Sequence, residues 1–521
     1  MNSLFSVAQI REIEQAACAN LATGALMQRA GAAAARLAQE LVSGPSGLLR
    51  VLVLAGPGNN GGDALDCAAR LSQAGMQVSC LLLSETGLTP DADLAHKRAR
   101  ASAVHFIDPV AAGDPASSIT STRWHLVIDG LFGIGLTRPL HGDLLRLVHS
   151  VNHFQCPVLA LDVPSGLDAD TGNVVGFDAA DPHAAQAIRA SHTITFIGDK
   201  PGLHTGMARD YVGQVHVARL EIDSRLYKPS HLDLNTSALF ARCSRQRLHY
   251  SHKLSHGNLA IIGGAPGMSG ALILAARAAL LAGAGRVQVF FVAPQSACPP
   301  FDPQHPELMC RPLEKEAPQQ AVQVVGPGMG SSKEACIALK HALSSDAALV
   351  LDADALNLLS LESGLQQLLR SRRAANILTP HPLEAARLLG QGARGAAQVQ
   401  ADRIKAAREL AQRYASIVIL KGSGSIIANP HGHVVINPTG GPALATAGTG
   451  DVLAGLCGAL LAQQWPAWEA ALAACWLHGK AGDSLTLEMG GACGICASEL
   501  PAQIRRELNQ LLRDHPHQAL R

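Results

Sequence analysis

The sequence contains few aromatic residues, which restricts how its interior can be built. Phe, Trp and Tyr make up 3% of the 521 residues, whereas hydrophobic residues as a whole make up 48%. The hydrophobic core must therefore consist mainly of Ala, Leu, Val and Ile. A chain of this length is long for one domain and comfortable for two.

An excess of charge of either sign is also absent. The formal net charge is +1, and only 16% of the residues are charged. This balance argues against a surface that binds nucleic acid or an anionic membrane. No apolar run reaches membrane-spanning length without interruption, and the first residues lack the basic start and apolar segment of a signal peptide. We therefore expect a cytoplasmic protein that binds neither nucleic acid nor a membrane.

The cysteines show neither a disulfide framework nor a metal-binding pattern. Twelve are scattered through the chain, and the one close pair, Cys493 and Cys496, has no second pair at metal-ligand spacing. Cysteines spread in this way through a large chain are typical of reduced thiols in a cytoplasm.

The first half of the chain alternates apolar strands with helical segments. Residues 6–42 and 64–74 have helical patterns, and the expected strands are 49–55, 77–83, 124–133, 157–166, 193–198 and 213–217. Strands separated by helices predict a parallel sheet, whose ligands gather at the carboxyl ends of the strands. Polar residues at such ends are Asn60, Asp129, Asp162 and Ser165.

A second α/β pattern begins after a stretch that lacks apolar periodicity. Its expected strands are 258–264, 286–292, 321–325, 347–351 and 417–420, with a helix at 271–282. We therefore predict an α/β protein of two domains, 1–225 and 246–521, joined by a linker at 226–245.

The stretch from Thr439 to Asp451 is rich in glycine and leads into the apolar segment 452–461. This order predicts a loop that opens onto a buried helix. The helix start attracts phosphate, and Asp451 there is suited to accept a proton from a hydroxyl beside the transferred phosphate. We expect the helix dipole to lower the pKa of Asp451. The alternative is that Asp451 only caps the helix.

Two further motifs of the second half support a phosphate site. A β-branched strand ends in the turn Lys421-Gly422-Ser423-Gly424-Ser425, and His381 lies between two prolines after another apolar run. The motif of the first half is Asn59-Asn60-Gly61-Gly62-Asp63, in which adjacent glycines permit close ligand contact and the polar residues supply hydrogen bonds.

These motifs resemble two enzyme families. Four motifs of the second half are similar to those of ADP/ATP-dependent NAD(P)H-hydrate dehydratases of the ribokinase-like superfamily. They are Leu420-Lys-Gly-Ser-Gly424, Thr379-Pro-His-Pro382, Asp352-Ala-Asp-Ala-Leu-Asn357 and Ala447-Gly-Thr-Gly-Asp451. Three motifs of the first half are similar to those of NAD(P)H-hydrate epimerases: Asn59 to Asp63, Val127 to Gly133 and Asp162 to Gly166. Together they resemble the bifunctional NAD(P)H-hydrate repair enzymes over nearly the whole chain.

The resemblance implies a Rossmann-like epimerase domain with a potassium ion and a hydrate site. Asn60, Asp129 and Ser165 would hold the K⁺ ion, since hard oxygen ligands suit such a cation. Asp129 would also be the acid/base residue, and Lys200, whose alternative is a solvated surface lysine, would assist. The expected substrate contacts are Asn59, Asn60, Gly61, Gly62, Asp63, Gly133, Ile134, Gly135, Leu136, Thr137, Arg138, Pro139 and Asp162.

The resemblance also implies a ribokinase-like dehydratase domain that uses ADP and Mg²⁺. Ala271, Gly328, Gly330, His381 and Asp451 would line its hydrate pocket, with Asp451 catalytic; Lys421, Gly422, Ser423, Gly424, Ser425 and Gly450 would bind the nucleotide. One of Asp352 and Asp354 would place Mg²⁺ or cap a helix. The expected substrates are NADHX and NADPHX, the hydrated forms of NADH and NADPH, and the protein is expected to be a homo-oligomer.

Two other classes of function remain open at this point. A ribokinase-like kinase acting on a small alcohol would explain the loop before Asp451, but not the fused first domain. A binding scaffold is the alternative for the first domain, although Asn60, Asp129 and Asp162 are polar residues that a scaffold does not need.

Overall fold

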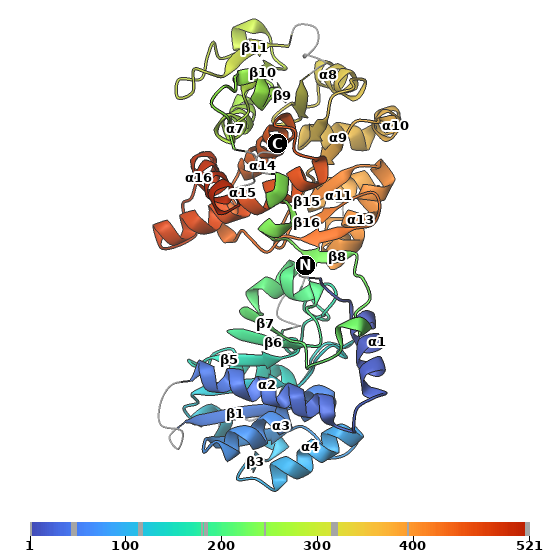
Figure 1. The fold of residues 1–521 in the computed structure, drawn as a ribbon, viewed down its shortest axis with the longest axis vertical. Coiled ribbons are helices and arrows are strands. Elements are labelled where there is room, and N and C mark those ends of the chain that lie inside the picture. The colour runs from blue at the N-terminus through green and yellow to red at the C-terminus, as the bar shows by residue number, and fades with distance from the viewer. Residues whose placement is uncertain are drawn as a thin grey trace. The chain divides into compact units, whose positions relative to one another are not determined.

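The computed structural model of the chain contains two compact units. It describes residues 3–42, 49–112, 118–178, 181, 186–243, 246–313, 321–392 and 395–515. The first unit is Ser3–Ser230 and the second contains His231–Arg521. Each unit contains one sheet with helices packed on it (Figure 1), which confirms the predicted two-domain α/β architecture.

The first unit has a seven-stranded sheet in the order β3-β2-β1-β4-β5-β6-β7, and every neighbouring pair is parallel. Its helices and strands are α1 (Val7–Cys18), α2 (Ala25–Leu41), β1 (Arg50–Ala55), α3 (Asn59–Gln73), β2 (Gln77–Leu82), α4 (Pro90–Arg100), β3 (His105–Ile107), α5 (Ser118–Ser121), β4 (Leu126–Gly130), α6 (Asp143–Val151), β5 (Val158–Leu161), β6 (His192–Phe196) and β7 (Gln214–Ala218). The strands predicted from continuous apolar runs are confirmed, and the short β3 was not predicted.

The helices of this unit correct two predictions. The single helix expected over 6–42 is wrong, because the chain forms α1 and α2 with Gly24 in the left-handed region at φ 74° between them. The helix expected to begin at Ala64 begins at Asn59 instead. The motif 59–63 is therefore the first turn of α3, and its backbone amides point out of a helix N-terminus.

Close packing explains why this turn contains glycine. A Cβ atom on Gly62 would lie 2.4 Å from Cε of Met27 on α2, and one on Gly61 would lie 1.8 Å from the carbonyl oxygen of Gly56. Side chains at these positions would separate α3 from α2 and from the end of β1. The glycines therefore hold the α3 N-terminus against the sheet edge.

The second unit has a ten-stranded mixed sheet in the order β11-β10-β9-β12-β13-β14-β15-β16-β17-β8. Its helices and strands are β8 (Leu232–Leu234), β9 (Asn258–Gly263), α7 (Ser269–Leu281), β10 (Arg286–Phe291), β11 (Met309–Pro312), β12 (Val322–Val325), α8 (Lys333–Leu343), β13 (Leu349–Leu351), α9 (Asp354–Leu361), α10 (Ser363–Ser371), β14 (Asn376–Leu378), α11 (Pro382–Leu389), α12 (Gly395–Ala401), α13 (Arg403–Tyr414), β15 (Ile417–Leu420), β16 (Ile426–Ala428), β17 (Val434–Ile436), α14 (Thr449–Ala462), α15 (Ala467–Met489) and α16 (Leu500–Asp514). Only β16 pairs antiparallel, with β15 on one side and β17 on the other.

The segment predicted as a linker contributes to this sheet. β8 lies within 226–245 and pairs with β17 in parallel. Asn235, which follows β8, is fully buried and donates hydrogen bonds to Oδ1 of Asn437 and to the carbonyl oxygen of Leu472. Phe240 is fully buried in the core of the same unit. These residues are thus structural parts of the second unit.

The core of the second unit is built around α14, which is buried along almost its whole length. A Cβ atom on Gly455 would lie 2.0 Å from the carbonyl oxygen of Ala275 on α7, so α14 and α7 pack with their backbones in close approach. The predicted buried helix is confirmed, as is a core made mainly of aliphatic side chains.

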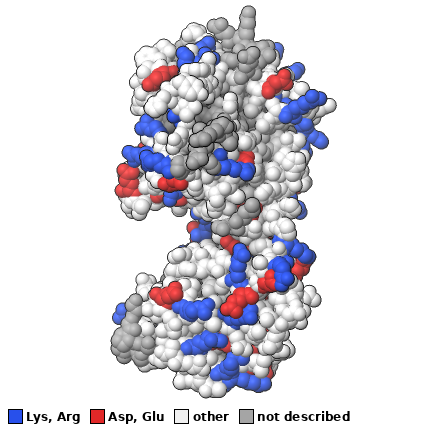
Figure 2. Space-filling view, viewed as in Figure 1, with Lys and Arg blue, Asp and Glu red and all other residues white. Residues whose placement is uncertain are grey.

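The surface shows no concentration of charge in the view drawn. Lys and Arg side chains alternate with Asp and Glu on each unit (Figure 2). Among the described residues, no helix is both long and apolar enough to cross a membrane. All twelve cysteines are free thiols.

Candidate active sites

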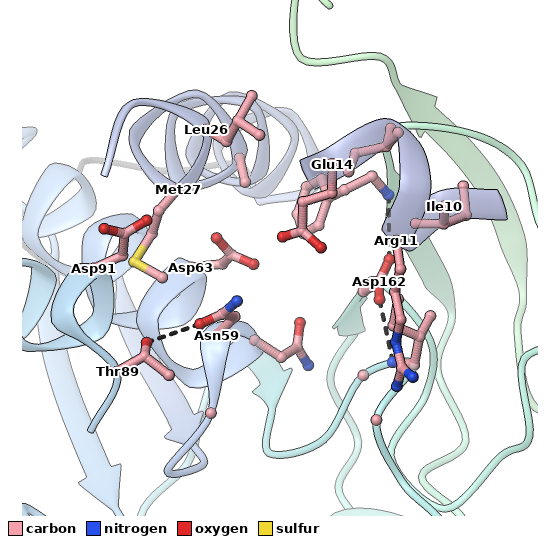
Figure 3. Close-up of a pocket in the computed structure, with 18 of the residues that line it drawn as sticks. Ile10, Arg11, Glu14, Leu26, Met27, Asn59, Asp63, Thr89, Asp91 and Asp162 are labelled. Atoms are coloured by element: carbon pink, nitrogen blue, oxygen red, sulfur yellow. Dashed lines mark hydrogen bonds between the residues drawn. The ribbon is translucent and has the colours of Figure 1, made fainter. Parts of the chain in front are cut away.

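A cavity of about 480 Å³ opens at the carboxyl ends of the strands in the first unit (Figure 3). Helices α1 and α2 form one wall, the start of α3 forms the floor, and the loops after β4 and β5 form the other wall. The predicted site residues that line this cavity are Asn59, Asn60, Asp63, Gly133, Ile134, Gly135, Leu136 and Asp162. The predicted residues Gly61, Gly62, Thr137, Arg138, Pro139, Asp129, Ser165 and Lys200 do not line it.

Three of these residues converge at one point of the cavity. A Cβ atom on Gly133 would lie 2.9 Å from Oδ2 of Asp162 and 3.3 Å from Cγ of Asn60. The backbone amide of Ile134 donates to the same Oδ2 at 3.3 Å. Glycine at 133 therefore allows the loop after β4 to fit between the amide of Asn60 and the carboxylate of Asp162.

Asp162 is held in position by Lys200. The residue has a left-handed φ of 64°, which is strained for a residue other than glycine, and its Oδ1 lies 2.8 Å from Nζ of Lys200. Lys200 is fully buried and also donates to Oγ1 of Thr195 and the carbonyl oxygen of Phe196. The alternative of a solvated lysine is therefore wrong. Lys200 does not line the cavity itself but fixes the position of the Asp162 carboxylate, which does.

Asp129 and Ser165 lie beneath the cavity and bind each other. Ser165 donates to both carboxylate oxygens of Asp129, through its hydroxyl at 2.6 Å and its backbone amide at 2.8 Å. Asp129 is fully buried, and burial raises its pKa to about 6 although the hydrogen bonds from Ser165 and Leu131 oppose the shift. The carboxylate is thus occupied by structural hydrogen bonds.

Asn60 differs from these two residues because its side chain is unsatisfied. It is 8% exposed, and both its Oδ1 and its Nδ2 are buried without a hydrogen-bond partner among the described residues. A buried polar group without a partner is costly. A side-chain carbonyl oxygen that lacks a donor, near the carboxylate of Asp162 across Gly133, fits a hard cation.

The cavity also contains acidic residues that the sequence analysis missed. Glu14 on α1 and Asp91 on α4 line it together with Asp63 and Asp162, and Arg11 is the nearby cation (Figure 3). One signal for Glu14 was available: it follows Ile10 by one helical turn and therefore lies beside the buried face of α1. No local pattern indicated Asp91.

In the second unit, the predicted phosphate site contains a buried ion pair. Nζ of Lys421 lies 2.6 Å from Oδ1 of Asp352 and 3.9 Å from Oε2 of Glu384. A Cβ atom on Gly450 would lie 3.3 Å from Nζ of Lys421. The carboxyl ends of β13 and β15 and the start of α14 therefore meet, and Gly450 leaves room beside the ammonium group.

Asp451 lies in the first turn of α14, but it is not a cap. The N-cap residue is Gly448, without a side-chain hydrogen bond, so the capping alternative is wrong. Burial raises the pKa of Asp451 to about 7, with Asp352 adding to the shift and Lys421 opposing it. The expected lowering of this pKa is also wrong, because burial and a nearby carboxylate outweigh the helix dipole.

His381 performs a structural role at the edge of the same site. It is the N-cap of α11, and its Nδ1 accepts from the amides of Leu383 and Glu384. Nε2 of His381 lies 3.1 Å from Oε1 of Glu384. Although burial acts in the opposite direction, His381 and Lys421 keep the pKa of Glu384 below its usual value. Glu384 was missed, although its position three residues after His381 matches a capping box.

The remaining residues of this site come from two neighbouring loops. A Cβ atom on Gly328 would lie 3.3 Å from Cβ of Ala271, which places these two predicted contacts together. The amide of Gly330 donates to Oδ2 of Asp354 at 2.8 Å. Within the described ranges, no three His, Cys, Asp or Glu side chains are arranged to hold a metal by themselves. A magnesium ion here would need the oxygens of a bound nucleotide as ligands, which is its usual mode of binding.

The turn after β15 rests on a buried arginine. Arg403 is 2% exposed, and its guanidinium donates to the carbonyl oxygens of Leu420 and Lys421. A Cβ atom on Gly422, which has a φ of 139°, would lie 2.8 Å from Nη1 of Arg403. Gly422 therefore lets the turn Lys421 to Ser425 sit directly on Arg403, with Ser425 closing it through a bond to the carbonyl oxygen of Gly422.

The two sites define an α/β enzyme with two separate ligand sites, the second of them at a helix N-terminus that suits a phosphate group. A family model described as NAD(P)H-hydrate dehydratase matches residues 259–506, and one described as YjeF-related protein N-terminus matches residues 23–202. The chain belongs to the family of bifunctional NAD(P)H-hydrate repair enzymes, as the sequence motifs predict.

Relatives of nearly full length support this membership. The bifunctional NAD(P)H-hydrate repair enzyme Nnr of Escherichia coli is 35% identical over 499 residues, covering 94% of this chain and 91% of the relative. The enzyme of the same name from Coxiella burnetii is 34% identical over 526 residues, covering 98% and 100%.

Two solved structures are similar to part of the chain. An ADP/ATP-dependent NAD(P)H-hydrate dehydratase from Bacillus subtilis, co-crystallized with ATP/Mg2+, is 28% identical with a TM-score of 0.47, covering 53% of this chain and 97% of its own. A ribokinase-like superfamily protein from Enterococcus faecalis is 24% identical with a TM-score of 0.46, covering 55% and 98%.

Proposed function

We propose that this protein repairs NADH and NADPH whose nicotinamide ring has been hydrated, with NADHX and NADPHX as substrates. The first unit interconverts the R and S epimers of the hydrate. The second unit removes water from the S form and consumes ADP. The observation that carries this assignment is that relatives named bifunctional NAD(P)H-hydrate repair enzymes align with nearly the whole chain, while a separate family model matches each unit. The homo-oligomer expected from the sequence stays a prediction.

The cavity of the first unit is the proposed epimerase site. The amides at the start of α3 offer hydrogen-bond donors to the hydrate beside the loop from Gly133 to Leu136, and Asp162 is fixed beside them by Lys200. A potassium ion would be held by Asn60, Asp129 and Ser165, whose side-chain oxygens are the hard ligands that such a cation prefers. Thr137, Arg138 and Pro139 continue the loop beyond the cavity and are proposed to contact the rest of the dinucleotide.

The start of α14 is the proposed dehydratase site. Asp451 accepts the proton of the substrate hydroxyl while that oxygen attacks the terminal phosphorus of ADP and AMP leaves, and the amides from Gly448 to Gly450 stabilise the charge that develops. Lys421, oriented by Asp352, binds the nucleotide phosphates with the turn up to Ser425. Magnesium bound with ADP would neutralise phosphate charge. The phosphorylated oxygen then leaves as phosphate, a far better leaving group than hydroxide, and the neighbouring ring carbon loses a proton to water, which restores the 5,6 double bond of the nicotinamide ring.

The pKa of Asp451 supports its role as the base. A carboxyl group with a pKa of about 7 is half ionised near neutral pH and binds a proton far more strongly than an ordinary aspartate. General bases work best when their pKa lies near the working pH. The carboxylate of Asp451 also has no hydrogen-bond partner among the described residues, so it is available to a substrate.

We predict that the two units keep their partial reactions when they are expressed separately. We place the boundary between Ser230 and His231, because β8 and Asn235 belong to the second unit. Fragment 1–230 should epimerise the hydrate without nucleotide, and fragment 231–521 should consume only the S epimer. Chromatography of the epimers during each reaction measures both results. Equal consumption of both epimers by fragment 231–521 would remove the need for an epimerase.

A shorter second fragment serves as the matched control. Fragment 246–521 lacks β8, the hydrogen bonds of Asn235 and the fully buried ring of Phe240. It should unfold at a clearly lower temperature than fragment 231–521, because each loss exposes or unpairs buried groups. Equal unfolding temperatures would show that residues 231–245 are a linker after all.

A further inference from the structure

Two carboxyl groups in the cavity of the first unit have no role in holding the fold. Glu14 on α1 and Asp63 on α3 point toward one another into the cavity (Figure 3). Neither has a hydrogen-bond or ion-pair partner within the described part of the chain. Asp162, by contrast, is tied to Lys200, and Asp129 is tied to Ser165. Glu14 and Asp63 are half-buried, and a carboxyl group without a partner is costly to remove even partly from water.

The surroundings of both carboxyl groups favour their protonated forms. Burial raises the pKa of Glu14, with Asp162 and Asp91 adding to the shift while Arg11 and Lys200 oppose it. Burial also raises the pKa of Asp63 well above its usual value, and Asp162, Glu14, Asp66 and Asp91 all act in the same direction. Two carboxyl groups that repel each other in one cavity each bind a proton more readily than an isolated carboxyl group.

We propose that Glu14 and Asp63 are the acid/base pair that epimerises the hydrate, each serving one face of the nicotinamide ring. The proposal rests on the assignment of this cavity as the epimerase site. The pair takes the acid/base role that the sequence predicted for Asp129, because Asp129 does not line the cavity and both its carboxylate oxygens accept hydrogen bonds.

The reaction follows from the chemistry of the hydroxyl-bearing carbon, which is also bonded to the ring nitrogen. The protonated member of the pair gives its proton to the hydroxyl group, the carbon–oxygen bond breaks, and water leaves. The lone pair of the ring nitrogen forms a double bond to that carbon, which gives a planar iminium cation. A water molecule then attacks the opposite face and loses a proton to the ionised member of the pair, while the electron pair returns to nitrogen. The pair carries one proton before and after, and no oxidant or reductant is needed.

The charge of the cavity fits the cationic intermediate. Glu14, Asp63, Asp91 and Asp162 all line the cavity, and Arg11 is the only basic residue in that lining. Negative groups fixed in a partly buried site stabilise a cation that forms during the reaction. Asp162, already positioned by Lys200, is suited to this role without transferring a proton. The same carboxylates would have no purpose in a site that only binds the anionic phosphates of a dinucleotide.

The test uses the full chain with Glu14→Gln and Asp63→Asn, and with Glu12→Gln as the matched control. Glu12 lies on the same helix but is exposed and pairs only with Lys228. Each of the first two variants should slow epimerisation in the absence of ADP by about 10²-fold or more, whereas Glu12→Gln should be unchanged. The ADP-dependent conversion of the S epimer should remain normal in all three, and unfolding temperatures should show that the first unit is intact.

Labelling with heavy-oxygen water shows whether the original hydroxyl group leaves during inversion. In water labelled with heavy oxygen, each inversion by the unaltered protein should place one labelled oxygen in the hydrate, because the original hydroxyl leaves as water. Inversion with the original oxygen retained would overturn the proposal, as would turnover within a few-fold of the unaltered protein in folded Glu14→Gln. If the unaltered protein does not epimerise the hydrate at all, the failure lies in the assignment of the cavity and not in the pair.

Discussion

Replacing Asp451 with Asn is expected to lower dehydratase turnover by about 10²-fold or more, the usual contribution of a general base. Asn keeps the size of the side chain but cannot accept the proton of the substrate hydroxyl. The affinity for ADP should change little or improve, because a carboxylate beside the phosphates is removed. Epimerisation should be unaffected, since its site lies in the other unit. Steady-state rates with the purified S epimer, together with ADP binding, measure these effects.

The pH dependence of the dehydratase rate is a second test of the role of Asp451. Because Asp451 must be ionised to act as a base, the rate at low substrate concentration should fall as pH decreases through about 7. The Asn variant should lose this dependence, while exposed Asp346→Asn should keep both the rate and the profile. An Asn variant that is folded and within a few-fold of the unaltered rate would show that Asp451 is not the base.

Replacing Lys200 with Met should have the largest effect on stability. Lys200 is fully buried and pairs with Asp162 at 2.8 Å. Removing one member of a buried ion pair leaves the other charge without its partner and costs about 3–5 kcal/mol. Asp162, whose backbone is strained, would lose its ion-pair partner beside the cavity, so epimerisation should fall as well. Chemical unfolding of the first unit, expressed as residues 1–230, measures the loss of free energy.

The control for Lys200 is another lysine of the same unit. Lys228 pairs with Glu12 across the surface, and both side chains are largely exposed. Exposed pairs contribute about 0–1 kcal/mol, so Lys228→Met should be nearly neutral. The double variant Lys200→Met with Asp162→Asn should recover part of the lost stability, because no buried charge remains unpaired. Equal stability of the two Met variants would contradict a structural pair at Lys200.

The strands were predictable where they are long and buried on both faces. β1, β4 and β5 are continuous apolar runs, because every side chain of such a strand is covered by helices. The strands β3, β8, β16 and β17 have three residues each. A run of that length carries no periodicity, and its pairing depends on partners distant in sequence.

The sites were predictable where glycine and polar residues occur together in one stretch. The motif 59–63 and the start of α14 were found in this way. Glu14 was missed because it comes from a helix far from the motif that it faces. The environment of Lys200 was left open and that of Asp451 was predicted wrongly, because burial and charges from other strands determine whether a lysine is solvated or an aspartate is ionised. Such effects depend on the tertiary fold.

In the proposed function two sites in one chain act on the hydrate in sequence, and only the second needs a nucleotide. The most direct measurement follows the pure R epimer of NADPH hydrate, incubated with the full-length protein with and without ADP and magnesium. With both present, the absorbance of NADPH should return completely. With nucleotide omitted and metal chelated, the R form should become a mixture of R and S, and no NADPH should appear. Recovery of NADPH without nucleotide and metal would show that the second site needs no nucleotide. An R epimer that remains unchanged would show that the first site is not an epimerase.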